Sequence, residues 1–156
     1  MALDSTFFKE LMSYQCSSVA VIGAVDASRL VGLAVSSFQS VSVAPPIVSF
    51  SLSHSSRSLS SIRGVKYVGI SLLGADQLEI GSRYSKPGSR RFAEGEFFIG
   101  PEGVPLIKSA VFHIASCIQS VLKVGGSDVF FASVIWGDFG DKKMPLRYWS
   151  REFISR

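Results

Sequence analysis

Apolar and polar residues alternate with the period of β-strands along most of the chain. Two such runs, residues 19–25 and 30–35, flank a polar turn at residues 26–29, which predicts a β-hairpin. The same pattern predicts further strands at residues 47–52, 65–73, 111–124, 129–135 and 146–153. The pattern therefore indicates a protein built mainly from short strands.

Short helices are expected at three places, one of them a helix to about Ile62 that follows the strand at residues 47–52 and its serine-rich segment. Asp4 or Ser5 can cap a first helix, and four residues give it an apolar face: Phe7, Phe8, Leu11 and Met12. The D-x-x-E pattern at residues 76–79 predicts the start of another helix that runs to about Tyr84. Glycine and proline in residues 85–104 favour a loop there.

The predicted fold class is mainly β, an antiparallel barrel that is closed or nearly closed, with short flanking helices. A doubly wound parallel sheet would need long helices between its strands, and the pattern offers none. We find no internal repeat and no linker, so residues 1–156 are expected to form a single domain.

Composition excludes several classes of protein. Apolar residues make up 47% of the chain and charged residues 18%, which argues against intrinsic disorder. The longest apolar run, residues 19–25, is far too short to span a membrane, and the N-terminus has no basic region typical of a secretory signal. Cys16 and Cys117 are 101 residues apart without a CxxC motif, so neither a metal site nor a disulfide is expected. These features favour a cytoplasmic protein.

The balance of charge and polarity favours an anionic small ligand. The net charge is +4, from 16 basic and 12 acidic residues, but no basic stripe or recognition helix suggests nucleic-acid binding. The chain also contains 28 serines, many of them between Ser36 and Ser61. Serine hydroxyls and the amides of serine-rich turns are suitable donors to a phosphate.

Three segments contain candidate binding residues. After the strand that ends at Val35, four serines follow within seven residues: Ser36, Ser37, Ser40 and Ser42. After the strand at residues 47–52, Ser55, Ser56 and Ser58 surround Arg57, whose guanidinium can hold a phosphate with two hydrogen bonds. A third segment, residues 125–131, begins with a glycine pair at a tight turn. In each case the residues could instead serve only the local backbone or turn, and the sequence leaves both interpretations open.

Other reactive side chains do not form a recognisable catalytic group. His54 is expected to face solvent, and His113 is expected to be a hydrogen-bonded histidine in or near the core. Asp128 is interpreted as a turn residue. Neither histidine can be grouped with carboxylates at the spacing of metal ligands.

Taken in order, these segments resemble the flavin reductase-like family. The resemblance begins at the first helix, continues through residues 18–22 (SVAVI) and 31–46 (VGLAVSSFQSVSVAPP), and includes residues 55–58 (SSRS). Further matches are residues 91–92 (RF), 103–106 (GVPL), 110–117 (AVFHIASC) and 145–148 (PLRY). The resemblance thus covers nearly the whole chain and implies the FMN-binding split-barrel fold and a homodimer with flavin near the subunit interface.

The resemblance also implies roles for individual residues. One matching segment is expected to contact the flavin ring system and ribityl chain, through Val35, Ser36, Ser37, Ser40, Val41 and Ser42. The other, Ser55, Ser56, Arg57 and Ser58, is expected to contact the flavin phosphate, and Arg91 to add a further phosphate contact. Many family members carry a histidine beside the flavin and nicotinamide where this chain has Ser127, so a catalytic role there is placed on Ser127.

The function implied by the resemblance is an NAD(P)H-dependent flavin reductase that supplies reduced FMN or FAD to a partner monooxygenase. NADH or NADPH would be the reductant, and no metal is expected. Ser127 keeps an alternative open, because serine cannot carry an imidazolium charge near the reduced flavin. That alternative is a flavin-binding split-barrel protein with little or no reductase activity. A third hypothesis is an oxidoreductase that acts on another substrate with a tightly bound flavin.

Overall fold

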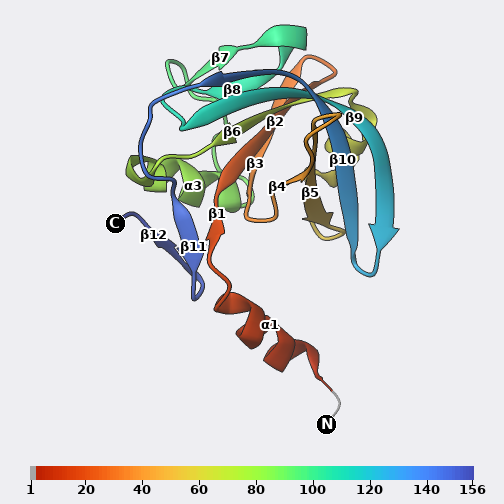
Figure 1. The fold of residues 1–156 in the computed structure, drawn as a ribbon, viewed down its shortest axis with the longest axis vertical. Coiled ribbons are helices and arrows are strands. Elements are labelled where there is room, and N and C mark those ends of the chain that lie inside the picture. The colour runs from red at the N-terminus through yellow and green to blue at the C-terminus, as the bar shows by residue number, and fades with distance from the viewer. Residues whose placement is uncertain (1–2) are drawn as a thin grey trace.

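The computed structural model describes residues 3–156, and its main element is a seven-stranded antiparallel sheet (Figure 1). The order of the strands across this sheet is β3-β2-β6-β9-β10-β5-β4. The strands are β2 (Ala20–Asp26), β3 (Arg29–Val35), β4 (Gln39–Ser42), β5 (Ile47–Ser53), β6 (Tyr67–Leu72), β9 (Phe112–Val124) and β10 (Ser127–Phe139).

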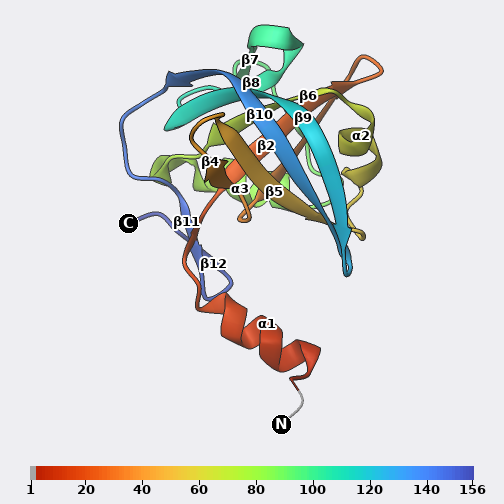
Figure 2. The ribbon, with the colours of Figure 1, turned by 45° about the vertical axis from the view of Figure 1, so that its right-hand side comes forward.

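The sheet is strongly curved but not closed. In Figures 1 and 2 it wraps around a central core, while β3 at one edge and β4 at the other are not paired with each other. The prediction of a mainly β antiparallel fold is therefore confirmed, and the barrel is split between its two edge strands rather than closed. This open side is where a ligand can bind, because the free edge of β3 and the end of β5 line a pocket there.

Small elements surround the main sheet. The helices are α1 (Ser5–Ser13), α2 (Leu59–Gly64) and α3 (Leu78–Ser85), with two 3-10 turns, η1 (Ala75–Gln77) and η2 (Pro101–Gly103). The remaining strands form two minor sheets: β1 (Ser17–Ser18), β11 (Arg147–Trp149) and β12 (Glu152–Ile154) in one, and β7 (Phe97–Ile99) and β8 (Pro105–Ile107) in the other. Within residues 3–156, no helix is long and apolar enough to cross a membrane.

The largest core lies inside the curved sheet. Its centre is a stacked pair of rings, Phe50 and Phe130, whose centroids are 5.0 Å apart. Leu59 and Ile62 of α2 are buried against the same cluster, so this short helix closes one end of the barrel. A second cluster, which includes Tyr84 and Leu146, packs α3 against the outside of the sheet. Burial of these apolar side chains is the main source of stability.

Helix α1 differs from the rest, because it extends away from the barrel (Figure 1). Asp4 caps it as expected, accepting a hydrogen bond from the backbone N–H of Phe7 at 2.8 Å. None of its residues is buried, and the predicted apolar face is exposed. The four residues of that face, Phe7, Phe8, Leu11 and Met12, are each 43–50% exposed.

Several predicted elements need correction. The single strand expected at residues 146–153 is a hairpin, β11–β12, because Ser150 and Arg151 both adopt positive φ and reverse the chain. Residues 85–104 are mostly loop, as predicted, and contain the short strand β7 and the turn η2. Asp76 does not cap the helix predicted to begin there: Gly74 donates its backbone N–H to the Gln77 side chain at 3.0 Å, and Asp76 is paired with Lys143.

Candidate functional site

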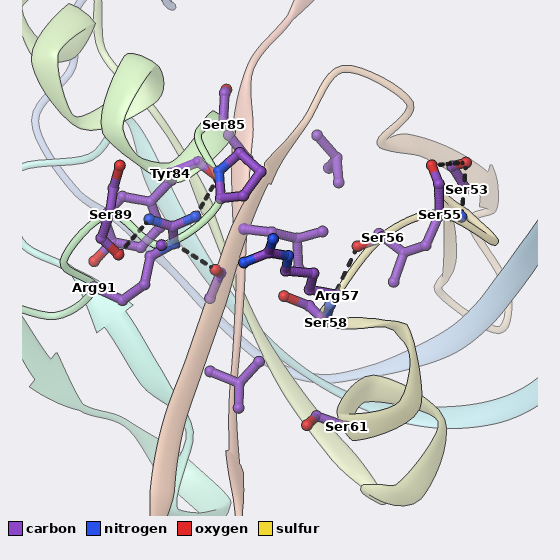
Figure 3. A pocket seen from close by; sticks show the side chains of 18 of the residues that line it. Ser53, Ser55, Ser56, Arg57, Ser58, Ser61, Tyr84, Ser85, Ser89 and Arg91 are labelled. Atoms are coloured by element: carbon purple, nitrogen blue, oxygen red, sulfur yellow. Dashed lines mark hydrogen bonds between the residues drawn. The ribbon is translucent and has the colours of Figure 1, made fainter.

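A pocket of about 800 Å³ opens where the barrel is split. Its floor is the free edge of β3, along its whole length from Arg29 to Val35. One wall is the end of β5 and the serine-rich turn that follows, and the opposite wall is the end of α3 with the loop up to Arg91 (Figure 3). A volume of this size lies within the usual range for small-molecule and cofactor sites.

The turn at residues 53–58 is organised by its own serines. The Ser53 and Ser55 hydroxyls are 2.9 Å apart, and the Ser56 backbone N–H donates to the Ser53 carbonyl at 2.9 Å. The Ser58 backbone N–H donates to the Ser56 hydroxyl oxygen at 3.3 Å. Since that hydroxyl acts as an acceptor, its own proton can be donated to a ligand. Ser58 precedes α2 but makes no side-chain capping bond, so its hydroxyl is not used by the helix.

Arg57 and Arg29 give the pocket a positive character. Three guanidinium groups line it, those of Arg29, Arg57 and Arg91, and no carboxylate does so among residues 3–156. The Arg57 side chain projects from the serine turn, and Ser55, Ser56 and Ser58 line the pocket beside it (Figure 3). A guanidinium next to donor hydroxyls is the arrangement that suits a phosphate. The four residues predicted to contact a phosphate are therefore brought together.

Arg91 also lines the pocket, but its guanidinium is hydrogen-bonded to the protein itself. Its five N–H groups donate to five backbone carbonyls, at 2.8–3.2 Å: those of Gly32, Arg83, Tyr84, Lys86 and Ser89. Because a guanidinium has only five such donors, none is left for a ligand in this structure. Arg91 instead ties the loop wall of the pocket to β3, which forms the floor.

A second network supports the same wall from behind. Tyr84 donates its hydroxyl proton to Glu96 at 2.8 Å and accepts a hydrogen bond from the Phe92 backbone N–H at 2.7 Å. Glu96 also forms an ion pair with Arg83. Burial alone would raise the pKa of Glu96, but the hydrogen bonds from Arg83 and Tyr84 outweigh it and hold that pKa below its usual value. Burial raises the pKa of Tyr84, so the phenol stays protonated.

Only the first part of the predicted segment at residues 35–42 lines the pocket. Val35, Ser36 and Ser37 line the pocket, whereas Ser40, Val41 and Ser42 lie on β4 and do not. The Ser37 hydroxyl accepts a hydrogen bond from the Ser51 backbone N–H at 3.0 Å and donates to the Ser51 carbonyl at 3.2 Å. In this structure the Ser37 hydroxyl is therefore bonded to the backbone of β5.

Ser127 lies next to the pocket without lining it. It is the first residue of β10 and pairs directly with Ser53, which does line the pocket. Paired residues in neighbouring strands point to the same face of a sheet, so Ser127 and Ser53 face the same way. Position 127 is therefore beside the rim, on the side of the serine turn.

Asp128 was misjudged from the sequence, whereas His54 is exposed as expected but also has a partner. Asp128 is not only a turn residue: it is 1% exposed and forms an ion pair with Arg63. His54 is exposed, and its Nε2 atom lies 2.8 Å from Asp128 Oδ1. The Arg63 hydrogen bond, helped by that of His54, outweighs burial and lowers the pKa of Asp128 to about 2. His113 is buried and hydrogen-bonded to the Ile107 carbonyl, as predicted.

Sequence reasoning also missed contributors to the pocket. Arg29, Ser51 and Tyr84 line it, but none lies in a segment with a recognisable binding pattern. Arg29 begins the hairpin strand β3, and only the edge position of that strand in the sheet exposes it to a ligand. Within residues 3–156, no cluster of three or more His, Cys, Asp or Glu residues could hold a metal ion.

The pocket fits a flavin nucleotide in size and in chemistry. Its lining offers backbone edges and apolar side chains for a flat ring system, with the cationic Arg57 and serine hydroxyls at one side for a phosphate. The lining contains no paired carboxylates and no histidine that could act as acid and base. The site is therefore better suited to binding and orienting two reactants than to proton-transfer catalysis.

Comparison with known proteins agrees with this description. The family model "Flavin reductase like domain" matches residues 12–155. The chain is 30% identical to an NADH:riboflavin 5'-phosphate oxidoreductase from Streptomyces pristinaespiralis, over 97% of this chain and 88% of that protein. It is 28% identical to the reductase subunit HsaB of a flavin-dependent monooxygenase from Rhodococcus jostii RHA1, over 85% of this chain and 68% of that protein.

Solved structures show the same fold. A flavin reductase domain protein from Arthrobacter sp. FB24 superimposes with a TM-score of 0.91 at 27% identity, covering 96% of this chain and 94% of that chain. The styrene monooxygenase flavin reductase from Pseudomonas putida S12 gives a TM-score of 0.84 at 25% identity, covering 94% and 95%. The family model, the relatives and the fold agree, and the chain belongs to the family of proteins with a flavin reductase like domain.

Proposed function

We propose that this protein is an NAD(P)H:flavin oxidoreductase that reduces FMN or FAD and passes the reduced flavin to a separate monooxygenase. The observation that carries the proposal is the pocket at the split of the barrel, with Arg57 and serine hydroxyls at one wall. Named relatives support it, because they include an NADH:riboflavin 5'-phosphate oxidoreductase and monooxygenase reductase subunits. Since a nicotinamide pool is needed, the proposal places the protein in the cytoplasm.

The chemistry divides between cofactor and protein. The flavin supplies a ring system that accepts hydride at N5 from C4 of a nicotinamide. The chain positions the reactants: the edge of β3 and residues Val35–Ser37 face the ring system, and the turn with Arg57 holds the phosphate. Because hydride transfer between stacked rings depends mainly on proximity, no acid or base from the protein is required.

The proposed assembly is a homodimer of single-domain subunits, each formed by residues 1–156. Support comes from exposed apolar side chains, those of Phe8 and Leu11 on α1, of Val41 on β4 and of Val43 directly after it. Exposed apolar patches of this kind mark protein interfaces. A second subunit seated on them would bring covering residues to the segment at β4, whose Ser40, Val41 and Ser42 lie outside the pocket of one protomer.

Steady-state oxidation of NADH and NADPH with added FMN, FAD or riboflavin tests the proposed activity. Turnover that depends on both protein and flavin is the expected result. The alternative function, flavin binding without useful reduction, is favoured by Ser127 in place of the family histidine. Flavin binding without NAD(P)H oxidation would support that alternative. A purified protein that keeps its yellow colour through gel filtration would instead indicate a tightly held flavin used on another substrate.

A further inference from the structure

A buried carboxylate beside the pocket has no part in the site as described so far. Asp128, the second residue of β10, is 1% exposed and accepts hydrogen bonds from two side chains. His54 donates from Nε2 to Oδ1 at 2.8 Å, and Arg63 donates from Nε to Oδ2. A buried carboxylate is costly unless it is paired in this way, so the arrangement needs all three residues.

One partner, His54, lies near the start of the serine turn, and the other, Arg63, lies on the helix that follows it. His54 immediately precedes Ser55, and Arg63 is on α2, which immediately follows Ser58. One carboxylate on β10 therefore binds both the first part of the turn and the helix that follows it. The backbone adds one bond on the entry side, from the His54 N–H to the Gly126 carbonyl at 2.8 Å.

The hydrogen bonds inside the turn cannot fix the direction of the turn relative to the rest of the pocket. Those of Ser53, Ser55, Ser56 and Ser58 join residues two or three positions apart, so they set the local shape of the turn. They do not determine how the turn is directed relative to β3 across the pocket. That direction decides where the Arg57 guanidinium lies, because its long side chain converts a small rotation of the backbone into a large displacement at the tip.

We propose that Asp128 is a positioning residue for the flavin phosphate, acting through His54 and Arg63 to direct the turn and its Arg57 into the pocket. The inference rests on the proposed function, since it assumes that a flavin phosphate occupies the turn. Asp128 touches neither the pocket nor a ligand, and its effect passes entirely through its two partners.

A purely electrostatic role and a positioning role for Asp128 predict opposite changes in FMN affinity when its charge is removed. Asp128→Asn takes away the negative charge that pairs with Arg63, and by electrostatics alone this would tighten the binding of an anionic phosphate. If the carboxylate acts by positioning, the same substitution weakens phosphate binding although the site becomes more positive. Riboflavin has no phosphate, so its affinity reports on the rest of the pocket and serves as the internal reference.

The experiment measures dissociation constants for FMN and riboflavin by quenching of flavin fluorescence in the wild type, Asp128→Asn, Arg57→Ala and the double variant. We expect Asp128→Asn to weaken FMN binding roughly ten-fold, as loss of one charge-assisted contact would, while riboflavin binding changes less than about two-fold. In the Arg57→Ala background, Asp128→Asn should leave FMN affinity nearly unchanged, because the group that it positions is gone.

Two matched controls separate positioning from general effects. Asp76→Asn removes an ion-paired aspartate at the surface, bound to Lys143 and outside the pocket lining. Leu106→Ala destabilises a buried core site in a different cluster. Neither should change the ratio of FMN to riboflavin affinity.

If Asp128→Asn does not fold, the variants Arg63→Gln and Arg63→Lys replace it in the test, since the Arg63 side chain is 47% exposed and tolerates substitution more readily. Lysine should restore much of the FMN preference that glutamine loses.

Three results would overturn the inference: tighter FMN binding in Asp128→Asn, equal weakening of FMN and riboflavin, or an undiminished effect in the Arg57→Ala background. Failure of the proposed function gives a different result. In that case the wild type itself binds neither flavin, or Arg57→Ala leaves the preference for FMN over riboflavin unchanged.

Discussion

At the scale of single residues, Arg57 is the side chain on which the phosphate assignment depends. Arg57→Ala should weaken FMN binding by about 1.5–3 kcal/mol, the usual contribution of a hydrogen bond to a charged group, which corresponds to roughly ten- to a hundred-fold. Riboflavin binding should change little, because it has no phosphate. Isothermal titration with both flavins checks this prediction, and equal weakening of the two would contradict it.

Asp128 should make stability depend on pH in acid. Its folded-state pKa of about 2 is below the ordinary value of 3.8, so the unfolded chain binds a proton more readily than the folded one. The stabilisation is complete above the ordinary value and is lost as the pH falls toward 2. The difference in denaturation midpoint between wild type and Asp128→Asn should therefore shrink over that interval in urea titrations. A difference that stays constant would show that the ionised carboxylate is not the stabilising form.

Ser127 is the position at which a histidine can be restored. If an imidazole beside the pocket helps to seat the nicotinamide or to stabilise charge on reduced flavin, Ser127→His should accelerate flavin reduction. Positioned acid or electrostatic groups contribute about 10²–10⁴-fold in general, but we expect about ten-fold here, because proximity supplies most of the rate. Flavin affinity should hardly change. Stopped-flow reduction by NADH measures the rate of flavin reduction. A slower variant would show that Ser127 does not limit that rate.

At the scale of elements, the loop wall of the pocket is held in place by one side chain, that of Arg91. Arg91→Lys keeps the charge but loses the planar group that reaches five carbonyls, so it should destabilise the protein by about 1–3 kcal/mol. The amides of residues 86–91 should also exchange faster with deuterium. Arg90→Lys is the matched control, because Arg90 is exposed and its side chain makes no such contacts. Equal exchange in both variants would rule out this role for Arg91.

A helix, strand or turn can be predicted from sequence when the residues that determine it lie within that element and have a recognisable pattern. The hairpin β2–β3, strand β5 and the N-terminal cap of α1 follow from local alternation and a local carboxylate, and all three are confirmed. The β11–β12 hairpin was missed because Ser150 and Arg151 adopt positive φ without the glycine or asparagine that usually announces such a turn.

The site also combines a local feature that the sequence predicts with contacts between distant residues that it does not. The serine turn could be located from sequence because its residues are consecutive. The contact of Arg91 with the Gly32 carbonyl and that of Asp128 with His54 join residues 59 and 74 positions apart. Such pairs are created by the sheet order, which no local pattern contains.

At the scale of the whole molecule, the exposed face of α1 should form a subunit interface. Phe8→Gln should shift the protein toward monomer at micromolar concentration in sedimentation velocity, because a large apolar side chain would be lost from the contact. Glu10→Gln introduces the same residue elsewhere on the helix and should leave the dimer intact. A wild type that sediments as a monomer and still binds flavin fully would contradict the proposed assembly.

The most direct test of the account is a crystal structure of the protein with FMN bound. We predict the isoalloxazine ring along the free edge of β3, and the phosphate within hydrogen-bonding distance of the Arg57 guanidinium and the Ser56 or Ser58 hydroxyl. Arg91 should keep its five carbonyl partners. A phosphate bound instead by Arg91 at the loop wall, or a flavin seated outside this pocket, would contradict the central claim.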